Sequence, residues 1–315
     1  MLETGNYDVL IPLSDSTMDL ITNHYDEIKR YVKLPVPNKT VFMRAYNKQE
    51  TMEICMDNGI PCPNTRRENQ SIYEFVNEVG FPLIAKPRMA NGSRGLKIVR
   101  DLKSLENLIN SKTIILEEYV IQEYIPQTGK QFNIHLFMDD NGEIASNLVT
   151  EKSRWFPVDG GASCLCRTFW HQKIAENCEK LLRAVGWRSY CEIEMIEDPR
   201  DGIAKVMEIN GRASASIKIM DLVQENVGKQ FLQLAYGIPV IKYGKPKDDI
   251  RLRCFITDVL WFIKSDDRFS RKPNWFSPIR THDVLFSLSD PLPFFAYLIK
   301  EIPKYSSEMK KRRRE

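Results

Sequence analysis

The sequence contains neither an apolar run that could span a membrane nor a recognisable secretory leader. No stretch of about 18 apolar residues occurs among its 315 positions. The opening residues, MLETGNYD, have neither a basic start nor an apolar block. The seven cysteines form no CxxC pair and no dense framework, which favours free thiols in a reducing compartment. We therefore expect a cytoplasmic protein.

The sequence also has little excess charge outside its last residues. The formal net charge is +3, and the tail KKRRRE contributes five positive charges and one negative. The rest of the chain is therefore near −1, without the basic face that nucleic-acid binding requires, so we expect no nucleic-acid partner. The tail itself suggests a weak contact with a membrane surface or a protein, although a solvated, disordered end is the commoner meaning of such a tail.

Several catalytic signatures are missing. The chain has no GxxxxGK[ST] loop, no GxGxxG after a strand and no nucleophile elbow. The four histidines are too scattered for a zinc site, and we interpret them as structural. These absences exclude the commonest nucleotide and hydrolase motifs, so any chemistry has to come from another pattern.

Strand-like and helix-like segments alternate along the chain, which predicts an α+β (α/β) fold. Residues 7–13 read as a buried strand and residues 17–32 as a helix, which together suggest a truncated N-terminal unit. Ser71 and Glu74 form a capping box for a helix that Gly80 ends. A Pro-, Trp- and Phe-rich composition begins near residue 245, where we place a domain boundary.

Two strands, SYCEIEMI and AKVMEIN, flank the turn formers EDPRDG and predict an antiparallel hairpin. Strand alternation places Glu192 and Glu194 on one face, and Val206, Glu208 and Asn210 on the matching face. If Glu194 and Glu208 lie opposite each other, their like charges require a cation between them. Mg²⁺ prefers such oxygen ligands. A solvated, charged hairpin face is the alternative.

Two weaker signals precede the hairpin. Lys86 closes the apolar strand FPLIAKP, and its ammonium fits either a nucleotide phosphate or a snorkelling side chain at a strand end. The turn-rich residues 91–95 that follow offer backbone amides for phosphate oxygens. Farther along, Gln122 and Glu123 lie at a break between strands that fits an adenine edge or a plain connection.

In this order, the Lys-Pro strand, the small-residue loop, QEYI, the acidic strand and MEINGR resemble the ATP-grasp superfamily. Within it, the chain is similar to the large chain of carbamoyl-phosphate synthase and to carboxylate-amine ligases. The resemblance covers about residues 7–243. It implies two α+β lobes that enclose ATP. On that basis we divide the chain into a partial N-terminal domain (1–45), lobe A (46–120), lobe B (121–245) and a C-terminal extension (246–315).

The resemblance also assigns roles to individual residues. The ATP phosphates fall to Lys48 and Lys86, and a loop covers them with Ser93, Arg94 and Gly95. The adenine falls to Gln122, Glu123 and Ile125, and the ribose to the position of Gln131, where relatives usually carry an acid. The magnesium (or manganese) ligands are Glu194, Glu208 and Asn210. The transferring phosphoryl group falls to Arg212, and a substrate carboxylate to Lys152 or Arg154 in the segment 151–163, whose residues otherwise read as an ordinary hairpin.

The activity implied is ATP-dependent activation of a carboxylate as an acyl phosphate, followed by attack of an amine to form an amide. The expected cofactors are ATP and Mg²⁺ (or Mn²⁺), the expected partners are a small carboxylate and a small amine, and a homodimer is a further hypothesis. One alternative is a nucleotide-binding regulator or scaffold without turnover. Another is an interaction protein that docks through its aromatic and basic C-terminal segment.

Overall fold

The computed structural model describes residues 5–89, 95–158, 161–223 and 226–300. The chain divides into two compact units, one of residues 1–151 and 168–248, the other of residues 152–167 and 249–315. No helix among the described residues is both long and apolar enough to cross a membrane. The longer segment of the second unit starts at residue 249, near the boundary expected at residue 245, and its other segment, 152–167, falls within the predicted lobe B. The four-part division of the chain stays a prediction.

The N-terminal segment differs from the prediction. Residues 7–13 do not form a strand, because Val9 makes a single isolated bridge with Lys33 and no neighbouring strand continues it. Tyr7 and Leu13 are exposed. The helix predicted over 17–32 is divided at His24, whose backbone is not helical. The first three helices are α1 (Asp15–Asn23), α2 (Tyr25–Ile28) and α3 (Lys39–Tyr46).

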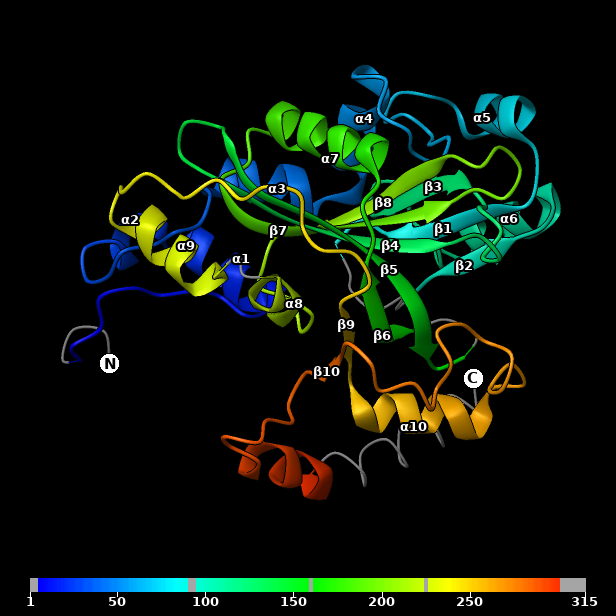
Figure 1. Ribbon diagram of the computed structural model, residues 1–315. Coiled ribbons are helices and arrows are strands. Elements are labelled where there is room, and N and C mark those ends of the chain that lie inside the picture. Colours follow the sequence, from blue (N-terminus) through cyan, green and yellow to red (C-terminus); the bar gives the residue numbers. More distant parts are fainter. Residues whose placement is uncertain (1–4, 90–94, 159–160, 224–225, 301–315) are drawn as a thin grey trace. The chain divides into compact units, whose positions relative to one another are not determined.

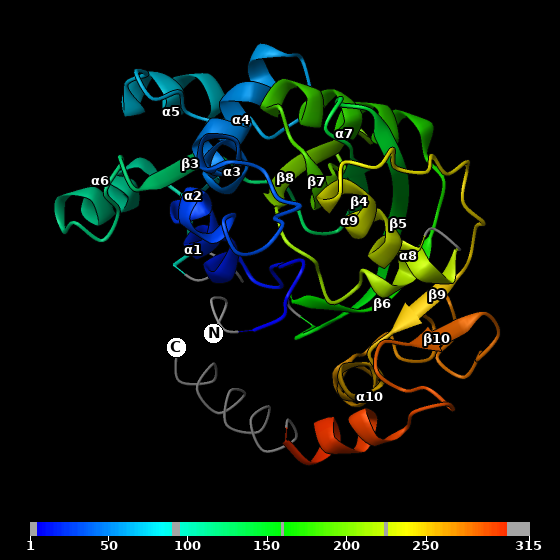
Figure 2. The ribbon, with the colours of Figure 1, turned by 90° about the vertical axis from the view of Figure 1, so that its left-hand side faces the viewer.

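The smaller sheet of the first unit is antiparallel with the order β2-β1-β3. The predicted capping box between Ser71 and Glu74 is present at the start of α5 (Ile72–Val79), and Gly80 ends this helix as predicted. A core centred on Phe75 and Leu83 joins the sheet to its helices, which lie beside it in Figures 1 and 2. The elements are α4 (Lys48–Asp57), α5 (Ile72–Val79), β1 (Leu83–Pro87), β2 (Lys97–Val99), α6 (Leu102–Asn110) and β3 (Tyr119–Glu123).

The larger sheet of the first unit has the order β5-β4-β7-β8. Its apolar face packs against α4 and α7, which lie on the same side of it in Figure 1. The apolar face of α7 is buried and carries Ile174, Cys178, Leu181, Leu182 and Val185. The elements are β4 (Gln131–Met138), β5 (Ile144–Phe156, whose end enters the second unit), α7 (Gln172–Val185), β7 (Ser189–Glu197), β8 (Ala204–Asn210), α8 (Lys218–Leu222) and α9 (Val227–Ala235).

The second unit contains β6 (Ala162–Thr168), β9 (Arg251–Arg253), α10 (Phe255–Lys264) and β10 (Thr281–Asp283). Its strands follow the order β6-β9-β10. Trp261 of α10 packs with Phe156 and Cys164 in a small core. The seven cysteines of the chain are all free thiols, as the sequence predicts.

Candidate nucleotide and metal site

The predicted acidic hairpin forms. β7 and β8 pair antiparallel, with Glu194 opposite Glu208 and Glu192 opposite Asn210. The face on which Val206 lies differs from the prediction. Met195 pairs with Val206, which leaves Met207 as an extra residue on β8. This β-bulge breaks the strand alternation. Val206 therefore joins the apolar core instead of sharing a face with Glu208.

The side chains at the end of β8 lie in contact with one another. The Asn210 amide Nδ2 donates to Glu194 Oε1 at 3.3 Å, and Arg212 Nη2 donates to Asn210 Oδ1 at 3.3 Å. Arg212 Nε lies 3.3 Å from Asp15 Oδ2 at the start of α1. The three predicted metal ligands are thus brought together, with the predicted phosphoryl-binding arginine beside them.

Two lysines from the other part of the first unit reach this hairpin. Lys48, the first residue of α4, lies with its ammonium 3.2 Å from Glu208 Oε2. Lys86, near the end of β1, donates from its ammonium to the Met207 carbonyl at 3.3 Å. The bulge explains this acceptor, because the extra residue of a bulge is left out of the ladder. Both lysines predicted to bind phosphate therefore meet the strand that carries Glu208 and Asn210.

Lys86 is held in an unfavourable environment for its charge. Its side chain is buried, and desolvation lowers its pKa to about 8, assisted by the positive charge of Lys48 and opposed by the carboxylate of Glu208. Burying this ammonium costs free energy, because no carboxylate among the described residues forms an ion pair with it. An anion that binds beside the ammonium would reduce that cost. A nucleotide phosphate would supply that anion.

The carboxylate of Glu123, which was predicted to contact adenine, is bound by other residues of the protein. Its carboxylate accepts from the Asn64 backbone at 2.9 Å, from Arg200 Nη2 at 3.0 Å and from Lys205 Nζ at 3.1 Å. Lys205 and Arg200 also bind Asp198, and these cations hold the Asp198 pKa well below its ordinary value. Glu123 therefore belongs to an ion network that ties β3 to the turn between β7 and β8. The sequence predicts the turn but not the ion pairs that its residues make.

Other predicted adenine residues keep unused hydrogen-bonding groups. Gln122 is buried and donates to Thr65 Oγ1 at 2.7 Å, while its Oε1 has no partner among the described residues. The Ile125 carbonyl accepts from Gln127 at 2.8 Å. The Ile125 N–H makes no hydrogen bond with the described part of the chain. Gln131, predicted for the ribose, begins β4 and is half-buried.

The predicted phosphate-covering loop is only partly described. Ser93 and Arg94 lie outside the described residues. Gly95 has φ +73°, and a Cβ placed there would lie 2.9 Å from Pro87 Cγ. Glycine is therefore required by both backbone conformation and space.

The predicted catalytic role of Arg154 is not supported. Its Nε and Nη2 atoms bind both carboxylate oxygens of Asp258 at 2.6 Å and 2.9 Å, and Nη1 donates to the Pro273 carbonyl at 2.8 Å. Both residues of the ion pair are buried in the second unit. The edge of the guanidinium that would bind a substrate carboxylate is therefore occupied by the protein's own carboxylate, which indicates a structural role.

Sequence reasoning also placed Glu192 on the acidic face without giving it a function. Glu192 is buried; its Oε2 accepts from Ser216 Oγ at 2.8 Å and lies 3.6 Å from His135 Nδ1. It anchors the segment that follows Arg212. Asp15 was missed as a partner of Arg212, because nothing in its local sequence indicates a contact with a strand almost two hundred residues away.

The residues present fit a magnesium ion by the chemistry of their donor atoms. Glu194 and Glu208 face each other with like charges, and Asn210 adds a neutral oxygen. Among the described residues, no group of three His, Cys, Asp or Glu side chains could hold a metal ion by itself. A set of two carboxylates and one amide agrees with a magnesium that is completed by waters and substrate phosphates.

Comparison with known proteins identifies the family of this chain. The family model described as "Carbamoyl-phosphate synthase L chain, ATP binding domain" matches residues 44–239. D-aspartate ligase of Enterococcus faecium is 22% identical over 259 residues, which are 73% of this chain and 61% of that protein. D-alanine–D-alanine ligase of Clostridium beijerinckii is 22% identical over 52% of this chain and 56% of its own length. The chain thus spans less than two thirds of these curated relatives.

Solved structures show the same fold. A biotin carboxylase complex from Campylobacter jejuni aligns with a TM-score of 0.60 and 15% identity, over 77% of this chain and 57% of that chain. D-alanine–D-alanine ligase from Bacillus anthracis complexed with ATP aligns with a TM-score of 0.56 and 17% identity, over 75% and 80%. From the family match and this shared architecture, the chain belongs to the ATP-grasp superfamily, in the family of the carbamoyl-phosphate synthase large-chain ATP-binding domain.

Proposed function

We propose that this chain is an ATP-dependent ligase that activates a carboxylate as an acyl phosphate and couples it to an amine. The observation that carries the proposal is the meeting of Lys48 and Lys86 with the strand end that bears Glu208. Relatives named D-aspartate ligase and D-alanine–D-alanine ligase are consistent with amide formation.

In this proposal the two lysines bind the ATP phosphates and Arg212 binds the phosphoryl group that is transferred. A carboxylate oxygen of the substrate forms a bond to the γ-phosphorus while the bond to the β,γ-bridging oxygen breaks, and ADP leaves. The amine then attacks the acyl carbon, loses a proton and expels inorganic phosphate. The lysines and the arginine act by positioning and by neutralising charge, because such transfers need little covalent participation of the protein.

Glu194, Glu208 and Asn210 are the residues that would hold magnesium. When bound, the metal neutralises charge on the phosphate oxygens. The adenine would lie against Gln122 Oε1 and the Ile125 N–H, two groups near the end of β3 without a described partner. The residues that bind the carboxylate and the amine are not assigned.

The test is ADP release with Mg²⁺ and ATP against a panel of carboxylates, including bicarbonate, amino acids, sugar acids and peptides, each with a panel of amines. Glu208→Gln should reduce ADP release by at least about a hundredfold, the scale of one lost electrostatic contact at such a centre. Glu197→Gln, the same substitution at the other end of the hairpin, is the matched control. Nucleotide binding without ADP release from any pair would instead indicate a non-catalytic nucleotide-binding protein.

A further inference from the structure

A group of buried polar side chains leads to the segment that follows Arg212. His135 of β4 and Tyr190 of β7 alternate with Ile134 and Cys191, which pack in the core beneath α7. The His135 and Tyr190 side chains therefore point to the opposite, acidic face of the larger sheet. Both are buried, so their polar atoms need partners within the protein.

The partners form a closed ring of five side chains, which we call the polar ring. The Tyr190 hydroxyl lies 2.8 Å from His135 Nδ1 and 3.0 Å from Ser214 Oγ. Ser214 Oγ lies 3.1 Å from Ser216 Oγ, which donates to Glu192 Oε2 at 2.8 Å. The same Glu192 oxygen lies 3.6 Å from His135 Nδ1. Four of these residues are buried, and Ser216 is half-buried.

The direction of donation in the polar ring follows from its carboxylate, because a carboxylate only accepts and a hydroxyl has one hydrogen to donate. Ser216 donates to Glu192, so its contact with Ser214 requires donation from Ser214. Tyr190 then donates to Ser214, and its oxygen accepts from His135 Nδ1–H. Burial lowers the pKa of His135, which keeps the imidazole neutral at neutral pH, although the Glu192 carboxylate opposes the shift. The imidazole therefore carries its proton on Nδ1 and not on Nε2.

The backbone at Arg212 is held on both sides. Before it, Gly211 passes so close to Trp187 that a Cβ there would lie 2.5 Å from the indole atom Cη2. After it, the polar ring binds Ser214 and Ser216. If the polar ring were broken, this segment would have to become ordered when a ligand binds, and that ordering weakens affinity.

We propose that Tyr190 is a positioning residue for Arg212: its hydroxyl joins Ser214 to His135, and the polar ring so formed directs Arg212 toward the phosphoryl group that is transferred. The inference rests on the proposed function, from which it takes the role of Arg212. Tyr190 is only 1% exposed, so it acts through this segment and not on a ligand.

The first test is calorimetric binding of ADP with Mg²⁺ to the full chain, with and without aluminium fluoride, which mimics a phosphoryl group in transfer. Aluminium fluoride should tighten binding at least about tenfold in the wild type and not in Arg212→Met. Tyr190→Phe removes only the hydroxyl. It should reduce this gain at least about fivefold and leave the Kd of ADP alone unchanged. Ser214→Ala breaks the polar ring at another position and should have the same effect.

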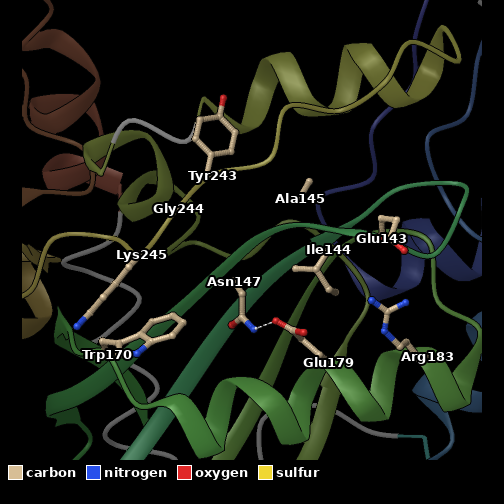
Figure 3. A pocket seen from close by; sticks show the side chains of 10 residues that line it. All are labelled: Glu143, Ile144, Ala145, Asn147, Trp170, Glu179, Arg183, Tyr243, Gly244 and Lys245. Atoms are coloured by element: carbon tan, nitrogen blue, oxygen red, sulfur yellow. Dashed lines mark hydrogen bonds between the residues drawn. The ribbon is translucent and has the colours of Figure 1, made fainter.

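Asn147→Ala is the matched control. Asn147 Nδ2 donates to Glu179 Oε1 at 2.8 Å, a contact drawn in Figure 3, and to the Ala175 carbonyl at 3.3 Å. This variant also loses two hydrogen bonds of the first unit, but on the α7 side of the larger sheet, and should keep the full gain from aluminium fluoride. An equal loss in Asn147→Ala and Tyr190→Phe would indicate general destabilisation and refute the positioning role.

Two readouts need no ligand. Nitrogen NMR of the imidazole should show His135 protonated at Nδ1, and the opposite tautomer would refute the donor order of the polar ring. Amide hydrogen exchange of residues 211–217 should be faster in Tyr190→Phe than in the wild type, and unchanged exchange would refute the hold on this segment.

The binding results separate the two levels of the argument. If aluminium fluoride tightens ADP binding equally in the wild type and Tyr190→Phe, but not in Arg212→Met, the positioning role is wrong while the proposed function stands. If it tightens binding in none of these proteins, the role of Arg212 in the proposed function is wrong, and the positioning role is wrong with it.

Discussion

Replacing Lys86 by methionine should stabilise the protein while it weakens nucleotide binding. Methionine has a similar length and no charge, so it suits the buried position of Lys86. Burial lowers the Lys86 pKa from 10.5 to about 8. That difference disfavours the protonated side chain in the folded state by about 3 kcal/mol, since a tenfold change in a proton-binding constant corresponds to about 1.4 kcal/mol.

The variant also loses an interaction. The Lys86 hydrogen bond to the Met207 carbonyl, at 3.3 Å, contributes about 1 kcal/mol. Glu208 keeps its contact with Lys48. The expected net change is therefore an increase of about 1–2 kcal/mol in the free energy of unfolding at pH 7, measured by urea unfolding of both proteins.

The pH dependence identifies the cause. The folded-state pKa is lower than the unfolded-state pKa, so between pH 8 and pH 10.5 the unfolded wild-type chain binds more protons at this side chain. Wild-type stability consequently gains in that window, and the advantage of Lys86→Met should be full below about pH 8 and shrink as the pH rises above it. Other lysines titrate in both proteins and cancel in the difference.

Lys264→Met, at an exposed lysine of α10, is the control and should change stability little at any pH. A Lys86→Met protein that is less stable than wild type at pH 7, or whose advantage does not depend on pH, would refute the desolvation argument. ATP binding by calorimetry should be weakened at least tenfold, since the cation at the phosphate site is gone.

Three further predictions follow from named contacts. Arg154→Met should destabilise the second unit by about 3–5 kcal/mol because it leaves Asp258 buried without its cation, while Arg154→Met with Asp258→Leu should recover most of that loss in urea unfolding; equal loss in both variants would contradict it. Gly95→Ala should lower thermal stability and weaken ATP affinity, because alanine at φ +73° meets Pro87, whereas Gly228→Ala, whose added methyl group would meet nothing within 4 Å, should do neither. Glu123→Gln should lower the melting temperature and speed hydrogen exchange of the turn 198–203, since Arg200 and Lys205 lose a shared carboxylate, and unaltered exchange there would rule out the proposed tie.

The acidic hairpin could be predicted because its information is local. Strand alternation and the turn residues between the strands place Glu194 opposite Glu208, and the register agrees. The features that the sequence did not predict depend on residues that are far apart in the chain. The bulge at Met207, the contact of Asp15 with Arg212 and the ion pair of Arg154 with Asp258 all depend on partners outside the local sequence. The apolar stretch 7–13 was read as a strand because apolar composition does not reveal whether a neighbouring strand exists.

The contacts that join the smaller sheet to the acidic hairpin differ in kind at their two ends. At one end, Glu123 is tied to the hairpin by two cations, Arg200 and Lys205, which Asp198 holds in place, so separation there breaks two ion pairs. At the other end, the Lys48 ammonium lies 3.2 Å from Glu208 Oε2, and the Lys86 ammonium donates to the Met207 carbonyl at 3.3 Å. Separating the two sheets at the Glu123 end breaks ion pairs that belong to the protein alone, whereas at the other end the same ammonium groups are the ones proposed to bind phosphate.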